Sequence, residues 1–181
     1  MRTGTALCIA WLGLAWQAAG QGPARGLDEL SVAAGPGFTH VLNNSAPDGD
    51  FVAATLSWRR FVAERHALGV EAVPLFIVSQ GESVHGYGFT LIGRHFLTPI
   101  GGAALFWEWG AGLLHFERDV PPDTLRTPFT LRVGAGLRHA LGSRKALVLG
   151  YRLHHISNAG RAERNPGLNS SFPYIELSFA F

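Results

Sequence analysis

A histidine and a serine, His155 and Ser157, stand two positions apart at the end of an alternating apolar run that begins near Lys145. In an extended strand, successive side chains point to opposite faces, so these two side chains share one face. A serine hydroxyl beside an imidazole is the arrangement of a nucleophile and its general base. The spacing alone fits such a pair, and it fits two ordinary polar residues at a strand end equally well.

The composition indicates one domain that is apolar for its size. The chain has 181 residues, of which 47% are hydrophobic and 15% are charged. Its formal net charge of +2 is small and its basic residues are dispersed, so nucleic acid is not an expected partner.

The first twenty residues have the features of an export signal. Arg2 is followed by an apolar core from Ala6 to Ala15 and by the small residues Ala18, Ala19 and Gly20. The apolar core is too short to span a bilayer as a helix. We therefore expect a signal peptide over residues 1–20 and a mature domain over residues 21–181. The one cysteine, Cys8, lies in the signal, so no disulfide or cysteine-bound metal is expected in the mature domain.

Period-two alternation dominates the rest of the chain and predicts about eight strands. Within residues 103–116, for example, Trp107 and Trp109 fall on one face, whereas Glu108 and Gly110 fall on the other. Each strand has about ten residues or more, which is the length that a tilted strand needs to cross a membrane. The predicted strands lie near residues 27–39, 51–61, 67–78, 84–97, 103–116, 128–140, 145–157 and 172–181.

The polar face of these strands is small or charged, and the apolar face is large. The chain has a single lysine, Lys145, and its strand charges balance in sign, as an enclosed polar interior requires. These charges belong to Arg59, Glu71, Glu108, Arg132, Arg138, Arg152 and Glu176. Only closed barrels satisfy every strand hydrogen bond within a bilayer. The predicted fold is an all-β, eight-stranded antiparallel transmembrane β-barrel of the bacterial outer membrane.

The ends of the strands agree with this fold. The last strand alternates apolar residues up to the terminal Phe181, which resembles the C-terminal signature of bacterial outer-membrane proteins. The connections expected to face outward include the long segments 41–50, 117–127 and 158–171, whereas 62–66, 98–102 and 141–144 are short. Pro74 interrupts the third strand, where we expect a bulge or kink.

The predicted topology places His155 and Ser157 at the outer end of the seventh strand, on its apolar face. A polar pair facing hydrocarbon is costly as packing, but it is reasonable if the substrate is a lipid. His154 points to the opposite face, so His154 and His155 cannot share a metal ion. The remaining histidines show no ligand spacing, and we expect neither a metal nor a cofactor.

The segment from His155 through Ile156, Ser157, Asn158 and Ala159 to Gly160, continued by Asn165-Pro166-Gly167, resembles the signature of a known family. This family is that of the PagL-type lipid A 3-O-deacylases, the outer-membrane acyloxyacyl hydrolases. The close match covers roughly the last forty residues, and the remainder is similar in size, signal and barrel pattern.

This resemblance implies a serine esterase with Ser157 as nucleophile and His155 as base and then acid. Gly160, through its backbone N–H, and Asn165, through its side-chain amide, match the oxyanion-hole positions, and Asn158 matches a supporting position. The family's best-known form has a glutamate that orients the histidine, where this chain has Asn169. An amide oxygen also accepts the histidine N–H, although it supplies no charge; Glu163 is the alternative acid in the same loop.

The implied reaction is calcium-independent hydrolysis of the ester-linked 3-hydroxyacyl chain at position 3 of lipid A, in lipopolysaccharide of the outer leaflet. Trp107 and Trp109 are candidate residues of an acyl-chain groove. The alternative is a non-catalytic small barrel with a structural, adhesion or small-solute role. The sequence leaves open whether the barrel forms a homodimer.

Overall fold

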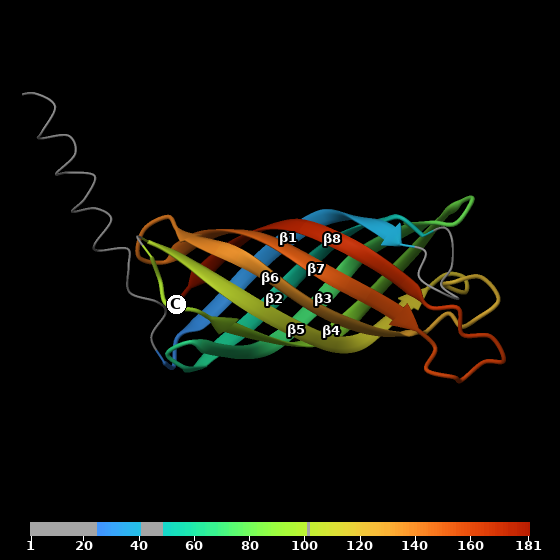
Figure 1. Ribbon diagram of the computed structural model, residues 1–181, viewed down its shortest axis with the longest axis horizontal. Helices are drawn as coiled ribbons and strands as arrows, with labels where there is room; N and C mark the ends of the chain where they lie inside the picture. Colours follow the sequence, from blue (N-terminus) through green and yellow to red (C-terminus); the bar gives the residue numbers. More distant parts are fainter. Residues whose placement is uncertain (1–24, 41–48, 101) are drawn as a thin grey trace, which may run out of the picture.

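The computed structural model describes residues 25–40, 49–100 and 102–181. The predicted signal peptide and residues 41–48 lie outside these described residues. Eight antiparallel strands form a closed barrel in which each strand pairs with the next and the last pairs with the first. These strands are β1 (Asp28–His40), β2 (Phe51–Ala63), β3 (His66–Ser79), β4 (Ser83–Phe96), β5 (Ala103–Phe116), β6 (Phe129–Ala140), β7 (Lys145–Ser157) and β8 (Leu168–Ala180). The predicted fold is therefore confirmed (Figure 1).

The two ends of the barrel differ. The C-terminus and the start of β1 lie at one end, and the long β5–β6 and β7–β8 connections extend from the other (Figure 1). We call the end with these long connections the outer end, because outer-membrane barrels place their long loops outside the cell. Across the described ranges, no helix has the length and apolarity to cross a membrane.

The observed strand bounds agree with the predicted ones to within a few residues, except for β8. This strand begins at Leu168, so the prediction of a strand from 172 and a loop over 158–171 is wrong. Asn169, Ser170 and Ser171, near its start, are as polar as loop residues. They belong to the strand because His154 pairs with Ser170 and His155 with Asn169 in the β7–β8 ladder.

The predicted irregularity at Pro74 is confirmed. The ladder between β3 and β4 shifts register between Val73 and Phe76, and the ladder between β2 and β3 shifts between Ala54 and Leu56. Proline has no N–H to donate to a ladder, so the strand bulges where it occurs.

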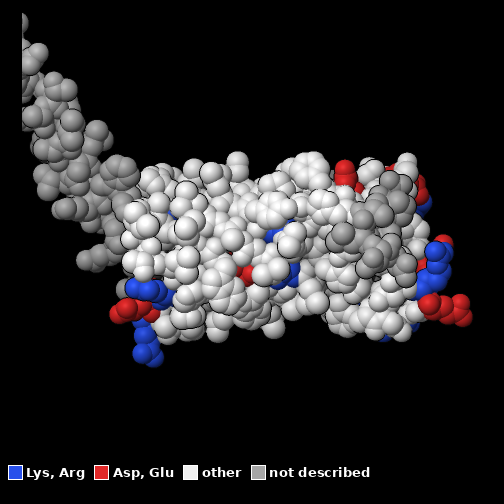
Figure 2. All heavy atoms as spheres, in the orientation of Figure 1, with Lys and Arg blue, Asp and Glu red and all other residues white. Residues whose placement is uncertain are grey.

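The outer surface of the wall is apolar and exposed. Leu91 is 56% exposed and Ile175 is 59% exposed. In a water-soluble protein, most large apolar side chains of this kind would be buried in the core. Lysine, arginine and acidic side chains gather at the two ends of the barrel, with few charged atoms visible between them (Figure 2). This apolar belt is the surface that meets lipid.

A buried network of arginine and glutamate fills the middle of the barrel. Arg94 forms ion pairs of 2.9 Å with both Glu108 and Glu176, and Arg59 pairs with Glu176 at 2.6 Å. Arg152 bridges Glu108 at 2.7 Å and Glu71 at 3.3 Å. All the charged residues predicted to face the interior do so, and Glu29 and Arg94 join them. Because each charge has an opposite partner, the polar interior is compatible with burial.

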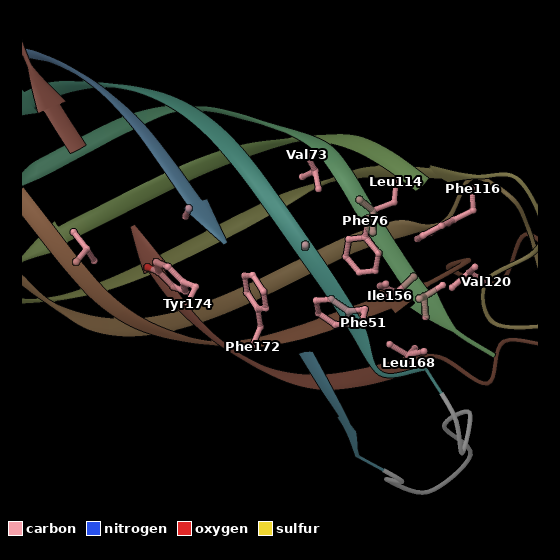
Figure 3. Packing of buried hydrophobic residues seen from close by; sticks show 14 of the residues in the cluster. Phe51, Val73, Phe76, Leu114, Phe116, Val120, Ile156, Leu168, Phe172 and Tyr174 are labelled. Carbon is pink, nitrogen blue, oxygen red and sulfur yellow. The ribbon is translucent and has the colours of Figure 1, made fainter. Parts of the chain in front are cut away.

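Towards the outer end, aromatic and aliphatic side chains replace the ionic network (Figure 3). Phe51 stacks on Phe76 with ring centroids 4.4 Å apart, and Phe172 lies 5.5 Å from Phe51. The space left between these rings and His154 is about 20 Å³, about what one water molecule needs. At this level the interior is a packed core rather than a channel.

The ionic network predicts that stability depends strongly on Glu176. The substitution Glu176→Gln leaves Arg59 and Arg94 without this carboxylate, so we expect it to lower the free energy of unfolding by about 3–5 kcal/mol. Urea unfolding in phospholipid vesicles, followed by tryptophan fluorescence, measures the change. The control is Arg60→Ala, which removes the exposed 3.5 Å pair with Asp28 and should cost less than about 1 kcal/mol. Equal losses in the two variants would show that the buried network is not what stabilises the barrel.

Candidate active site

The alternation of β7 and β8 places three side chains of the predicted site on the outer surface of the wall. His155 and Ser157 point outward on β7, and Asn169 points outward on β8 directly opposite His155. Their strand neighbours Ile156 and Leu168 point inward, are fully buried and lie opposite each other. Both belong to the apolar cluster at the outer end of the core (Figure 3). The packed interior therefore holds the two strand segments that carry the site.

Asn169 orients the imidazole of His155. The Asn169 side-chain oxygen lies 2.8 Å from Nδ1 of His155. An amide oxygen only accepts hydrogen bonds, so Nδ1 carries the hydrogen and Nε2 is the nitrogen left to accept a proton. In the described part of the chain, no hydrogen bond joins His155 to Ser157. Such bonds are often long in the absence of substrate.

Asn158, the first residue after β7, makes several of the hydrogen bonds that hold the loop. It is 1% exposed, and its side chain accepts the N–H of Gly160 at 2.8 Å and donates to the carbonyl of Arg164 at 2.5 Å. Its own backbone N–H donates to the side-chain oxygen of Asn165 at 3.1 Å. The supporting position assigned to Asn158 from the sequence is thus a clamp that closes the loop over residues 158–165.

The clamp has different consequences for the two predicted oxyanion donors. Because Asn165 uses its oxygen to accept from Asn158, its amide nitrogen is left without a hydrogen bond within the described residues and can donate elsewhere. The N–H of Gly160 is bonded to Asn158 in this state. Ala159 and Gly160 adopt left-handed backbone conformations, with φ of 53° and 76°.

Gly167 is a site residue that the sequence pattern did not single out beyond its place in the motif. Its φ is 64°, and a Cβ at this position would lie 3.1 Å from Cε1 of His155. The chain therefore passes against the imidazole at a point where only glycine fits without strain. The Asn-Pro-Gly turn was the available signal, but it did not indicate which ring the glycine contacts.

Glu163 lies exposed in the same loop and makes no ion pair or hydrogen bond within the described ranges. The partner of the His155 imidazole in this structure is Asn169.

A groove of about 480 Å³ crosses the outer surface of the wall and reaches the site. Its apolar floor and sides come from β5, β6 and β7, and its polar end includes His155 and Asn169. The apolar residues are Trp109, Ala111, Leu131, Val133 and Leu153. Trp107 lines a different depression, of about 610 Å³, together with Leu105 and Tyr151. Of the two tryptophans singled out in the sequence, only Trp109 lines the groove that reaches His155.

Another serine on the same surface of the wall, Ser171, does contact a histidine. Nε2 of His40 is 2.5 Å from the hydroxyl of Ser171, which also contacts the Tyr151 hydroxyl. Ser171 is paired with strands on both sides, opposite Phe38 and opposite Leu153. Backbone N–H groups inside such ladders are committed to neighbouring strands, whereas Ser157 ends its strand and is followed directly by a loop.

The histidines do not form a metal centre in the part of the chain that the structure describes. No group of three or more His, Cys, Asp or Glu side chains is placed to hold an ion there. His154 points into the barrel, is 7% exposed and contacts the Thr130 hydroxyl at 2.5 Å, so the prediction that it is an interior polar residue is confirmed. The same prediction for histidines such as His85 and His115 is wrong, because both are exposed on the outside of the wall.

The fold and its apolar belt define an outer-membrane β-barrel, and comparison with known families specifies which kind. The family described as "Lipid A 3-O-deacylase (PagL)" matches residues 52–178. Because this match covers well over half of the chain, the protein belongs to the lipid A 3-O-deacylase family, as the sequence motif predicted. Its members are ester hydrolases, so the alternative of a non-catalytic barrel is not supported.

Comparison with solved structures agrees at the level of the fold. The outer-membrane enzyme PagL is 20% identical with a TM-score of 0.59, over 82% of this chain and 97% of that one. Neisserial surface protein A is 14% identical with a TM-score of 0.62, over 88% and 99% of the two chains. The N-terminal barrel domain of Pseudomonas aeruginosa OprF is 11% identical with a TM-score of 0.58, over 88% and 100%. Among curated proteins, no sequence match is found.

The contact between Gly167 and His155 yields a test of how the imidazole is held. Gly167→Ala adds a methyl group 3.1 Å from Cε1 of His155, which should displace the ring and lower kcat for lipid A deacylation by about tenfold or more. Fatty acid release from lipid A in detergent micelles measures the rate. The matched control is Gly81→Ala, because Gly81 also has a positive φ, of 80°, but has nothing within 4 Å of an added Cβ. If both variants lose activity equally, backbone strain explains the loss and the contact with His155 does not.

Proposed function

We propose that this protein removes the 3-O-acyl chain of lipid A by serine-esterase chemistry, with Ser157 as nucleophile, His155 as acid and base, and Asn169 as the residue that orients His155. The observation that carries the proposal is the 2.8 Å contact between His155 Nδ1 and the Asn169 oxygen on the lipid-facing side of the wall. This contact leaves Nε2 of the imidazole free to act as the base, and Ser157 lies on the same face of β7. A polar contact on a surface that faces lipid is costly unless it has a function.

The proposed reaction has two halves. The Ser157 oxygen attacks the ester carbonyl carbon while His155 Nε2 takes the hydroxyl proton. The tetrahedral intermediate collapses, the bond to the sugar oxygen breaks, and that oxygen receives the proton from His155. Water then attacks the acyl-serine, with His155 again acting as base, and returns the serine hydroxyl. The products are lipid A with a free hydroxyl at position 3 and a 3-hydroxy fatty acid.

Asn165 and Gly160 are the proposed donors to the oxyanion. The amide nitrogen of Asn165 is available because the opposite end of its side chain is held by the Asn158 N–H. The N–H of Gly160 donates to the Asn158 side chain at 2.8 Å, so in the proposal it exchanges this acceptor for the oxyanion when substrate binds. A developing negative charge is a stronger acceptor than a neutral amide oxygen, which favours the exchange.

Asn169 fixes the tautomer of His155 but supplies no negative charge. During attack, His155 becomes positively charged, and a carboxylate at its other nitrogen would stabilise that charge. With a neutral amide at position 169, His155 is therefore a weaker general base than it would be beside a carboxylate. Glu163 remains the fallback acid of the proposal and would have to approach His155 from its exposed position.

The apolar groove gives the acyl chain a place on the barrel surface. The groove runs along Trp109, Leu131 and Leu153 and ends at His155, so an acyl chain in it would present its ester at the outer end of the wall. The sugar head would then lie among the outer loops, outside the hydrocarbon region. This placement suits lipopolysaccharide, which occupies the outer leaflet.

The direct test of the nucleophile is Ser157→Ala. Removing the hydroxyl should lower kcat by about a thousandfold or more, because no acyl-serine can form. Mass spectrometry of fatty acid released from purified lipopolysaccharide measures the rate. Ser143→Ala, in the turn between β6 and β7 at the opposite end of the barrel, is the control and should keep the parent rate. Release by Ser157→Ala at the parent rate would contradict the proposed nucleophile.

A second test addresses Asn169. Asn169→Ala removes the acceptor from His155 Nδ1 and should lower kcat by about tenfold or more, whereas Asn169→Asp supplies a carboxylate of the same size and should raise it. The same release assay is used, with circular dichroism to confirm that each variant is folded. Unchanged rates in both variants would exclude Asn169 from the proposed site.

A further inference from the structure

A fixed arginine lies beside the proposed nucleophile. Phe129 on β6 is the direct cross-strand partner of Ser157, and both side chains lie on the outer surface of the wall. The guanidinium of Arg161, from the β7–β8 loop, stacks over the Phe129 ring with its central carbon 4.4 Å from the ring centroid. Directly opposed residues of a ladder have Cβ atoms about 5 Å apart, so this positive charge stacks on the residue that neighbours Ser157 across the ladder.

The guanidinium is held on two of its three nitrogens. Nη2 donates to the carbonyl of Thr127 at 2.6 Å, and Nε donates to the carbonyl of Asn158 at 3.2 Å. With the ring beneath it, these bonds restrict a side chain that would otherwise be mobile at the surface. Nη1 makes no hydrogen bond within the described residues. Because the side chain is already restrained, a ligand that binds to Nη1 costs little further side-chain conformational entropy.

The charge of Arg161 is not neutralised by the protein, unlike that of two other arginines on the outer loops. Arg118 pairs with Glu82, and Arg164 lies 3.7 Å from Asp123. Arg161 has no carboxylate within ion-pair distance in the described part of the chain; its partners are backbone carbonyls and a ring. An anionic ligand could therefore form the ion pair that Arg161 lacks within the protein.

We propose that Arg161 binds a phosphate monoester of the lipid A head group and thereby selects the ester that is hydrolysed. This inference rests on the proposed function. Lipid A is a diglucosamine with a phosphate on each sugar, and the ester at position 3 shares its ring with the phosphate at position 1. An ester on Ser157 therefore brings a phosphate close to Arg161. Guanidinium groups bind phosphate through paired, charge-assisted hydrogen bonds, which supports this ligand over a neutral sugar hydroxyl.

The phosphate bound could belong to the sugar that is deacylated or to the distal sugar. The experiment measures kcat and KM on three lipid A substrates: one with both phosphates, one without the phosphate at position 1, and one without the phosphate on the distal sugar. The variants are Arg161→Gln and Arg161→Lys. Arg164→Gln is the control, from the same loop, because its exposed side chain pairs only with Asp123.

On the substrate with both phosphates, Arg161→Gln should lower kcat/KM by about ten- to a hundredfold, mainly through KM, and Arg161→Lys should lower it less. On the substrate that lacks the bound phosphate, the parent should already be slow, and Arg161→Gln should make little further difference. The substrate on which the parent and Arg161→Gln have the same kcat/KM lacks the phosphate that Arg161 binds. Arg164→Gln should match the parent on all three.

Three results would overturn the inference. An equal loss for Arg161→Gln on all three substrates would mean that Arg161 only holds the loop through Thr127 and Asn158. Equal parent kcat/KM on all three would mean that no phosphate is recognised. Failure of the parent to release fatty acid from any of them would overturn the proposed function, and this inference with it.

Discussion

Closure of the backbone hydrogen-bond ladder in a bilayer is the constraint on which the rest of this structure depends. Hydrocarbon offers no partner to an unpaired N–H or C=O, so all eight strands must join into one barrel. Each strand then has an inner and an outer face, so of two adjacent residues one contacts the barrel interior and the other contacts lipid. His154, His155 and Ile156 show this directly: the first and third are buried in the core, and the second lies on the surface.

The same alternation explains how a polar site is held rigidly on a surface that faces lipid. Ile156 and Leu168 pack inside the barrel opposite each other, and their outward neighbours His155 and Asn169 are thereby placed in hydrogen-bond contact. Deeper in the barrel, buried ion pairs such as that between Arg94 and Glu176 occupy the interior. The site is thus positioned by the wall itself, and the loop after β7 contributes the remaining groups through the clamp at Asn158.

Much of the fold could be predicted from the sequence, because the two-residue period of a strand, and the face on which each side chain lies, depend only on the order of residues. Alternation predicts the strand count, the inward arginines and glutamates and the outward His155 and Ser157. The family was indicated separately, by the resemblance of the motif after His155. Contacts that depend on register or on loop geometry were not predicted. The start of β8 was missed because Asn169, Ser170 and Ser171 are as polar as loop residues. The contacts of Gly167, Asn158 and Arg161 depend on how the loop folds back onto β6 and β7, and no period in the sequence encodes that.

The most direct test of the central claim is labelling with an organophosphate that reacts with activated serines. The protein in detergent micelles is treated with the reagent, and the modified peptide is located by mass spectrometry while deacylation of lipid A is followed in parallel. We predict one adduct, on Ser157, formed in step with the loss of activity. An adduct on Ser171, whose hydroxyl lies 2.5 Å from His40, would contradict it, as would full activity after complete labelling of Ser157.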